Sequence, residues 1–408
     1  MTTDNNRDLL KEIKAIVSQC DRCGTCLPVC PLFGVKDVEA SSARGKINLA
    51  RALAEGGFAP DANILDKMNF CLLCRTCIDN CPSKVKTDEA MIAVRQYIAD
   101  RTGGPGVKYR TLGGMLKKRG LVKLSACALG AAKKLGLGGL VPHGMAPAPY
   151  SREQYLARFA GPAALAGKAP ATVATVDPAA RVAYFQGCGM RMMFPDAVAE
   201  TRKVLGTVTA VGEVDNVCCG LPHLAHGLRE DFLALAKENI RLFAAFDIVV
   251  SDCASCAGTL KHFAAYLADD PAWRDAAKAF SAKVMGLSEY LAKAGYQPRQ
   301  RSAARVTFHE PCHLGRGQGI KKEPRQLLSA AGDFVEMTGA DVCCGGAGSF
   351  HTDYPAAAAA ILEKKRANIE KSGADIVVSE CPVCLVQLGK AAAKSGGRFK
   401  VMHISQVL

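Results

Sequence analysis

The first hundred residues follow the spacing of amphipathic helices, interrupted by two polar loops that carry cysteine. Apolar side chains recur every three or four positions over residues 9–16, 43–55 and 88–99, which predicts three helices. We therefore expect residues 1–100 to form a small, mostly helical domain.

After residue 180 the pattern changes to short apolar runs that alternate with helical segments. The same order occurs in residues 181–300 and again in residues 301–408, which indicates a duplicated unit. Short strands separated by helices favour parallel sheets. We thus expect an α+β multidomain chain, in which a helical domain precedes a duplicated α/β domain. The predicted strands are residues 182–185, 208–211, 248–250, 306–308, 334–337 and 376–378, and the predicted helices include 195–205, 229–246, 324–331 and 354–372.

A connector, residues 101–180, separates the two regions and holds most of the excess positive charge. Residues 101–150 contain nine Lys or Arg and no Asp or Glu, so they account for nine of the net +14 charges. The later part, residues 142–178, is rich in Ala and Pro, as is typical of a linker.

One helix predicted within the basic segment has an apolar stripe opposite its lysines. The helix either lies in a membrane interface and contacts anionic lipid, or packs through the stripe on protein while the lysines are solvated. The stripe comprises Leu121, Leu124, Ala128, Ala131 and Leu135, and the other side carries Lys123, Lys133 and Lys134.

The composition excludes several classes of protein. With 49% hydrophobic and 22% charged residues, the chain is neither collagen-like nor disordered. No apolar segment follows Met1, and no run of 18 apolar residues lacks a charge, so we expect a cytoplasmic protein without a signal peptide or membrane span. Aromatic residues make up only 6% and no nucleic-acid-binding module is recognisable, so we expect no nucleic-acid partner.

The 19 cysteines are the unusual feature of the composition. A large cytosolic chain has little use for disulfides, so metal binding is the expected role of these cysteines. Eight of them form two C-x2-C-x2-C-x3-C-P motifs, which comprise Cys20, Cys23, Cys26 and Cys30 before Pro31, and Cys71, Cys74, Cys77 and Cys81 before Pro82.

This spacing is typical of loops that wrap a cubane iron–sulfur cluster. Three close cysteines bind one cluster, and the fourth reaches the other cluster in two-cluster ferredoxins. Zinc would use paired C-x2-C groups and does not call for this motif. We predict two [4Fe–4S] clusters in a ferredoxin-like domain, with ligands Cys20, Cys23, Cys26 and Cys81 for cluster 1 and Cys71, Cys74, Cys77 and Cys30 for cluster 2.

Each C-terminal repeat holds five cysteines: one alone, an adjacent pair before Gly, and a C-x-x-C. Adjacent cysteines cannot both bind a single metal with relaxed geometry, so a polynuclear cluster is favoured, and structural zinc is the alternative. Cys127 belongs to no group and is expected to be a packing or surface residue. The predicted ligands are Cys188, Cys218, Cys219, Cys253 and Cys256 in the first repeat, and Cys312, Cys343, Cys344, Cys381 and Cys384 in the second.

Four histidines near these cysteines are candidates to donate hydrogen bonds to cluster sulfurs or to relay protons. Ordinary loop histidines would produce the same pattern. The four are His309 and His313, which flank Cys312, and His223 and His226, which follow Cys219.

Taken together, these motifs resemble the family of iron–sulfur subunits of glycolate oxidase and D-lactate dehydrogenase, and the related catalytic subunit of heterodisulfide reductase. The resemblance covers about residues 10–408 and includes the segment T-F-H-E-P-C-H-L-G-R-G-Q-G-I at 307–320. It implies two cubanes and one or two further iron–sulfur clusters in the cysteine-rich "CCG" repeats. Many glycolate oxidase subunits have lost cysteines from the first repeat, whereas this chain keeps five in both.

The resemblance also implies a role in electron transfer. An FAD-linked partner would oxidise glycolate or D-lactate, and electrons would pass through this chain to a quinone or another carrier, with possible peripheral contact at the inner face of the membrane. The chain itself has no strand–GxGxxG–helix motif, so we expect no flavin or nucleotide in it and no catalytic residue of its own. The alternative is a thiol–disulfide reductase subunit whose CCG clusters are catalytic, and a respiratory adaptor without either substrate is a third interpretation.

Overall fold

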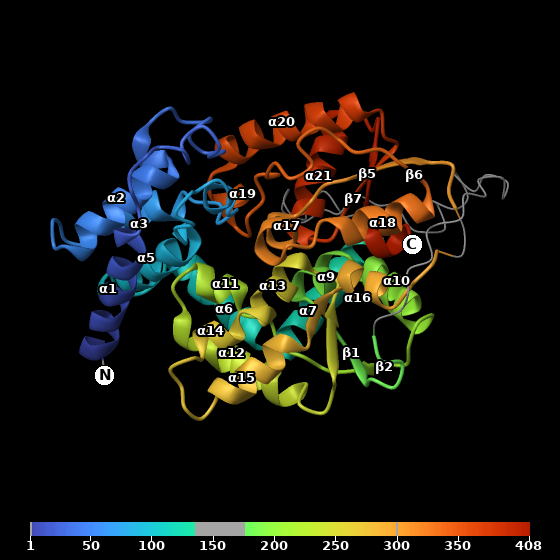
Figure 1. The fold of residues 1–408 in the computed structure, drawn as a ribbon, viewed down its shortest axis with the longest axis horizontal. Coiled ribbons are helices and arrows are strands. Elements are labelled where there is room, and N and C mark those ends of the chain that lie inside the picture. Colours follow the sequence, from blue (N-terminus) through green and yellow to red (C-terminus); the bar gives the residue numbers. More distant parts are fainter. Residues whose placement is uncertain (1, 135–175, 299–300) are drawn as a thin grey trace. The chain divides into compact units, whose positions relative to one another are not determined.

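The computed structural model describes residues 2–134, 176–298 and 301–408 (Figure 1). Most of the expected linker at 142–178, and Leu135 of the apolar stripe, lie outside the described residues. The chain divides into two compact units. Unit 1 comprises Met1–Met115, Gly220–Phe232 and Gly345–Ile361, and unit 2 comprises Leu116–Cys219, Leu233–Cys344 and Leu362–Leu408.

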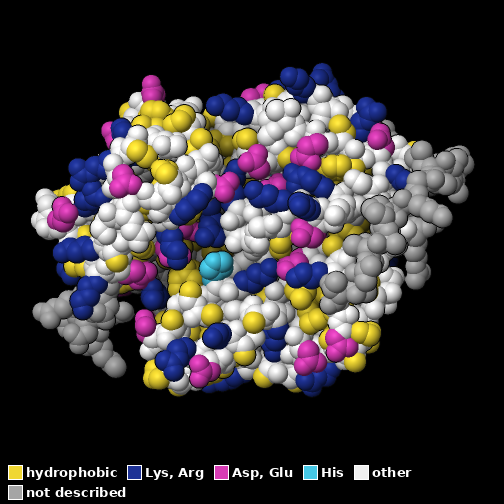
Figure 2. Space-filling view, viewed as in Figure 1, with side chains coloured by type: hydrophobic (Ala, Val, Ile, Leu, Met, Phe, Trp, Pro, Cys, Tyr) yellow, Lys and Arg dark blue, Asp and Glu magenta, His cyan; other side chains and the backbone are white. Residues whose placement is uncertain are grey.

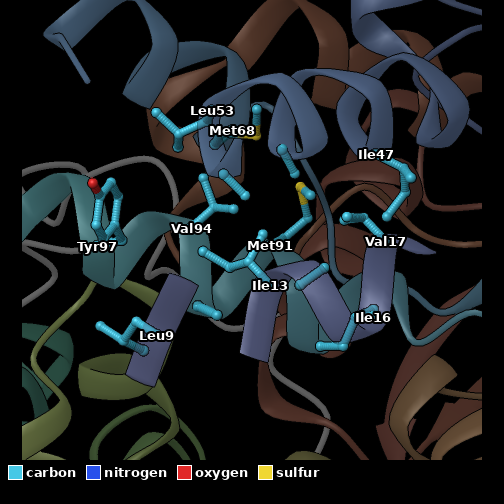
Figure 3. Close-up of a cluster of buried hydrophobic side chains, with 14 of the residues drawn as sticks. Leu9, Ile13, Ile16, Val17, Ile47, Leu53, Met68, Met91, Val94 and Tyr97 are labelled. Carbon is cyan, nitrogen blue, oxygen red and sulfur yellow. The ribbon is translucent and has the colours of Figure 1, made fainter. Parts of the chain in front are cut away.

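Unit 1 is helical, as the spacing of its apolar residues predicts. Four helices, α1 (Thr2–Ser18), α2 (Ala43–Ala54), α3 (Ala62–Asn69) and α5 (Thr87–Arg101), surround one apolar core (Figure 3). Further elements are η1 (Glu39–Ser41), α4 (Thr76–Asp79), α6 (Val107–Lys117), α11 (Leu221–Ala225) and α19 (Phe350–Asp353). The core side chains include Leu9, Ile13, Ile16, Val17, Ile47, Leu53, Met68, Met91, Val94 and Tyr97.

A side-chain cap and a glycine fix where α2, a helix between the two cysteine motifs, begins. Ser42 Oγ accepts a hydrogen bond from Gly45 N at 3.0 Å, which caps α2. A Cβ at Gly45 would lie 2.0 Å from Glu39 O, so only glycine lets α2 start this close to η1.

Unit 2 contains two four-stranded sheets that are parallel throughout. The first has the order β2-β1-β3-β4, and the second has the equivalent order β6-β5-β7-β8. This repeated topology confirms the predicted duplication of an α/β unit. The strands are β1 (Val182–Phe185), β2 (Val211–Glu213), β3 (Ile248–Ser251), β4 (Val284–Gly286), β5 (Arg305–Phe308), β6 (Asp333–Phe334), β7 (Ile376–Ser379) and β8 (Lys400–His403).

Helices follow the strands and place the cysteines at the carboxyl ends of the sheets, where ligands of parallel sheets gather. Cys188 begins α9 after β1, and Cys312 begins α17 after β5. Cys253 and Cys381 are the N-cap residues of the helices that follow β3 and β7. The helices are α9 (Cys188–Met193), α10 (Pro195–Gly206), α12 (Arg229–Leu242), α13 (Ala254–Lys261), α14 (Phe263–Tyr266), α15 (Arg274–Ala282), α16 (Leu287–Lys293), α17 (Cys312–Gln318), α18 (Lys322–Ala331), α20 (Pro355–Ser372), α21 (Pro382–Lys394) and η3 (Ile404–Gln406).

Three predicted element boundaries are wrong. Helix α10 runs to Gly206 and ends in a turn, so β2 begins only at Val211 and the predicted strand 208–211 starts too early. Helix α12 ends at Leu242 rather than at residue 246. Just after its end, Lys283 Nζ donates to the carbonyls of Phe243 and Phe246, each at 2.7 Å. Strand β6 is shorter than the predicted 334–337.

Over residues 102–134, the described part of the basic segment forms the helices α6 and α7 (Arg119–Lys134). Two of its basic side chains form ion pairs within unit 2: Arg119 with Glu238 at 2.7 Å and Lys123 with Asp215 at 3.0 Å. Leu124 of the apolar stripe is 65% exposed, so it is not packed against the residues that the structure describes. Among the described helices, none is long and apolar enough to cross a membrane.

The surface in Figure 2 carries both signs of charge. Lys and Arg side chains are interspersed with Asp and Glu over the visible face. The net positive charge is therefore not expressed there as one continuous basic patch.

Candidate metal centres

One cavity of unit 1 is lined by cysteines from both N-terminal motifs. Cys81, the fourth cysteine of the second motif, lines this cavity together with the first three cysteines of the first motif. This is the arrangement that exchange of the fourth ligand requires. Arg44 also lines this cavity, and its Nε donates to Glu39 Oε1 at 2.8 Å. The lining cysteines are Cys20, Cys23, Cys26, Cys77 and Cys81.

A second cavity of unit 1 shows the reciprocal arrangement. Cys30, the fourth cysteine of the first motif, lines it together with the second motif. Burial, and then the neighbouring Cys74 and Cys71, raise the pKa of Cys77 well above its usual value, because a second thiolate nearby is unfavourable without a cation. The lining cysteines are Cys30, Cys71, Cys74 and Cys77.

A buried lysine also lines the second cavity. Lys46 is 1% exposed, and its Nζ donates to the carbonyls of Ser41 and of Ala40, the latter at 3.4 Å. Burial lowers its pKa, while Cys71 and Cys30 act in the opposite direction. The ammonium group therefore balances thiolate charge at this cavity.

Arg95 of α5 fixes the loop that leads into the second motif. Its guanidinium is buried and donates to the carbonyls of Met68 at 2.9 Å, Cys71 at 3.0 Å and Ala225 at 3.1 Å. The Arg95 side chain thus joins Cys71 to the segment Gly220–Phe232. This segment directly follows the Cys218–Cys219 pair in the sequence. Sequence reasoning missed both Lys46 and Arg95, because a charged residue in a helical pattern is expected on the solvent side.

Two of the candidate histidines have hydrogen-bonding partners other than cysteine. His223 Nε2 lies 3.0 Å from Gly113 O. His226 stacks on Tyr109 with ring centroids 3.8 Å apart, and its Nε2 lies 3.1 Å from Ser349 Oγ. Burial, and then the charge of Arg95, lower the pKa of His226 to about 3. Both histidines are therefore placed as packing residues of unit 1.

In the first repeat, the structure gathers the predicted cysteines from three segments of chain. Cys188 Sγ lies 3.6 Å from Cys218 Sγ, and Cys253 Sγ accepts from Cys256 N at 3.4 Å. A hydrogen bond with Cys219 is the first cause that raises the pKa of Cys256, which places these two thiols side by side. Each of the five predicted residues thus has a neighbour within the set.

In the second repeat, Cys344 Sγ lies 3.4 Å from Cys384 Sγ, and Cys384 also contacts Cys381. Cys343 is buried beside Cys344, and Cys312 is half-buried at the start of α17. His309 joins this group, because its ligand atom and those of Cys344 and Cys384 all lie within 4.8 Å of one another. Burial holds the pKa of His309 well below its usual value, so its imidazole is neutral.

The two repeats differ in charge close to the cysteine pair. Lys365 of α20 is fully buried, and its Nζ donates to Gly339 O at 2.6 Å and to Ala340 O at 3.1 Å. Burial lowers its pKa to about 8, while Cys344 acts to raise it. In the first repeat a neutral residue of α12 lies beside the pair: Asn239 Nδ2 donates to Cys218 O at 3.0 Å.

The donor atoms fit iron–sulfur clusters. Soft thiol sulfurs line both cavities of unit 1 and gather in both repeats, a choice of ligand that selects iron–sulfur clusters or zinc over harder cations. Cys127 is exposed, which agrees with the expectation of a surface or packing residue. Bound iron–sulfur clusters supply one-electron transfer, and the protein sets their potentials through hydrogen bonds, charge and burial.

Fold and donor set are thus those expected of an iron–sulfur protein. Comparison with known families agrees: a "4Fe-4S dicluster domain" matches residues 16–85, and a "Cysteine-rich domain" (CCG) matches residues 182–261 and 306–389. The chain belongs to the family of CCG-domain iron–sulfur subunits of oxidoreductases that includes glycolate oxidase iron–sulfur subunits and lactate utilization protein A.

Three curated relatives illustrate the breadth of this family. The probable glycolate oxidase iron–sulfur subunit of Bacillus subtilis is 29% identical over 95% of this chain and 92% of its own length. Lactate utilization protein A of Shouchella clausii is 30% identical over 56% of this chain and 98% of its own length. One subunit of the fumarate reductase (CoM/CoB) of Methanothermobacter marburgensis is 32% identical over 57% of this chain and 46% of its own length.

Proposed function

We propose that the chain is the iron–sulfur electron-transfer subunit of a flavin-dependent 2-hydroxy-acid dehydrogenase, acting on glycolate or D-lactate. An FAD-linked partner subunit oxidises the acid, and this chain passes the electrons to a quinone or another carrier. The observation that carries the proposal is the gathering of thiols at four places in a chain whose relatives, over nearly the full length, include glycolate oxidase iron–sulfur subunits.

Within this proposal the cysteines take the roles that the sequence predicts. The first cavity of unit 1 holds one [4Fe–4S] cluster on Cys20, Cys23, Cys26 and Cys81. The second cavity of unit 1 holds another on Cys71, Cys74, Cys77 and Cys30. Each CCG repeat holds a further cluster on its five cysteines. Lys46 and Lys365 lie beside thiols without access to water, so they offset the negative charge that electrons add.

The test distinguishes the reaction of this chain from the reaction of its partner subunit. The chain purified alone under anaerobic conditions is expected to accept electrons from dithionite but not from glycolate or D-lactate. Addition of the FAD-linked subunit should let glycolate or D-lactate bleach the iron–sulfur absorbance. Stoichiometric flavin and 2-hydroxy-acid oxidation in the isolated chain would overturn this division of labour.

A second candidate function is reduction of a disulfide at the CCG repeats. Two observations favour it: both five-cysteine sets are complete, and one relative belongs to a fumarate reductase named for CoM and CoB. It predicts that dithionite-reduced chain, with no other subunit, reduces an organic disulfide, and that Cys384→Ser abolishes the reaction. Absence of disulfide turnover by the iron-loaded chain would exclude this function.

A further inference from the structure

A fully buried histidine lies among the cysteines of the second repeat. His309 follows β5 directly, is 1% exposed, and has its ligand atom within 4.8 Å of Cys344 Sγ and Cys384 Sγ. Three different segments of chain supply these three donors. Side-chain atoms that converge in this way from separate segments form the usual geometry of a metal site.

The imidazole has no well-aligned hydrogen bond within the described part of the chain. Neither Nδ1 nor Nε2 of His309 is paired there. The nearby carbonyl of Ala340 already accepts from Glu310 N and Lys365 Nζ, each at 3.1 Å. A buried polar group without a partner is unfavourable, so native structures satisfy nearly all of them. A metal centre beside Cys344 and Cys384 would satisfy one ring nitrogen of His309.

The backbone holds this histidine firmly in place. His309 N donates to Val378 O at 2.8 Å, and Ser379 Oγ donates to His309 O at 3.2 Å. Both bonds tie the residue to β7, the strand that leads to Cys381. The position of the ring relative to the C-x-x-C is therefore built into the sheet and does not depend on a surface loop.

The first repeat has phenylalanine at the corresponding place. The strands β1 and β5 pair with β3 and β7 in the same register, so Phe185, which lies opposite Ser251, corresponds to His309 beside Ser379. Phe185 is fully buried and packs on Phe243, with ring centroids 5.8 Å apart. A phenyl ring offers no ligand atom, so of the two repeats only the second has an imidazole here.

We propose that His309 contributes an imidazole nitrogen to the metal centre of the second repeat, which is thereby a mixed cysteine–histidine site. This inference rests on the proposed function only in assuming that the second repeat binds a metal. The neutral ring donates a lone pair to the metal, and no electron is transferred in forming the bond. A nitrogen ligand in place of one thiolate makes the centre less negative, and histidine ligation raises the potential of iron–sulfur centres.

The test looks for the nitrogen directly. The full chain is produced anaerobically with 15N-histidine and with unlabelled histidine, and the paramagnetic states are studied by electron–nuclear double resonance. A coupling of the strength of a directly bound nitrogen, which changes with the isotope, is expected in the wild-type protein. The coupling should disappear in His309→Gln, which keeps a polar side chain but removes the imidazole. It should persist in His313→Gln, the matched control on the other side of Cys312.

The remaining outcomes are distinct. Absence of histidine coupling in the iron-loaded wild-type protein overturns the inference, and so does coupling that persists in His309→Gln. If the second repeat contains zinc, X-ray absorption at the zinc edge decides. A shell with one nitrogen that is lost in His309→Gln supports this inference and overturns the proposed cluster, and an all-sulfur shell overturns both. The wild-type measurements stand even if His309→Gln fails to fold.

Discussion

Ser255 Oγ of the first repeat lies 3.6 Å from Cys381 Sγ of the second. Next to this contact, Ala254 N donates to Glu380 O at 2.8 Å, so the two C-x-x-C segments meet through backbone as well. The residue at the equivalent position of the second C-x-x-C is Val383, which has no hydroxyl. The contact is therefore one-sided: a hydroxyl of the first repeat contacts a predicted ligand of the second.

Replacement of Ser255 by Ala is expected to lower the reduction potential of the second-repeat centre. A hydroxyl that donates to a ligand sulfur stabilises the more negative, reduced state. Loss of about 1 kcal/mol corresponds to about 40 mV for one electron. Potentiometric titration followed by EPR measures the shift. Ser255→Thr should restore the potential, and equal potentials in wild type and Ser255→Ala would show that the contact has no electrostatic effect.

The iron content tests whether the repeats carry clusters at all. Two cubanes hold about eight irons, so clusters in the repeats raise the content of anaerobically purified protein well above that number. Replacement of Cys384 by Ser should lower the iron count, whereas Cys127→Ser, at an exposed cysteine outside the sets, should not. Iron near eight with one or two zincs per chain would contradict clusters in the repeats.

Exchange of the fourth ligand predicts which cubane depends on Cys30. Since Cys30 lines the cavity of the second motif, Cys30→Ala should damage the cluster built on Cys71, Cys74 and Cys77. EPR of the reduced variant should retain the signal of the cluster on Cys20, Cys23 and Cys26. The reciprocal variant, Cys81→Ala, should show the opposite loss. Loss of the Cys20 signal in Cys30→Ala would mean that each motif binds its own cluster.

The sequence predicts the strands β1, β3, β5 and β7 because each contains at least three consecutive buried residues that are mostly apolar. It misses β4 and β8, since β4 has three residues and β8 includes Lys400 and His403 in its short run. The predicted ligand sets rest on the spacing of the cysteines. Lys46, Arg95 and Lys365 could not be predicted as buried, because their partners are carbonyl groups that only the folded chain supplies.

The low pKa of His226 predicts that unit 1 loses stability as the pH falls. The pKa of this histidine falls from 6.5 to about 3 on folding, so the unfolded chain binds a proton that the folded chain does not. The stability that neutral His226 provides is complete above pH 6.5. It is lost as the pH falls toward 3, at about 1.4 kcal/mol per pH unit. His226→Phe keeps the stack on Tyr109 and should flatten the fall in anaerobic unfolding free energy between these values. An unchanged pH slope would show that other groups govern it.

The basic helix α7 predicts association with anionic membranes. Two of its leucines, Leu121 and Leu124, are 41% and 65% exposed, so an apolar surface is available beside basic side chains. A basic amphipathic helix gains both apolar burial and electrostatic attraction at an anionic surface, and each basic residue there contributes about 1 kcal/mol. Wild-type protein should therefore sediment with vesicles that contain anionic lipid at low salt, and salt should release it.

Two variants separate the apolar and the electrostatic contributions to this association. The double variant Leu121→Gln with Leu124→Gln removes exposed apolar surface. A variant with five substitutions removes charge by changing Lys117, Lys118, Arg119, Lys133 and Lys134 to Gln. Both variants should lose sedimentation with vesicles and keep their iron content. Lys321→Gln with Lys322→Gln, at exposed sites in the second repeat, serves as the charge control and should bind as wild type does. If wild-type protein ignores anionic vesicles at low salt, the exposed leucines are a contact for a protein partner instead.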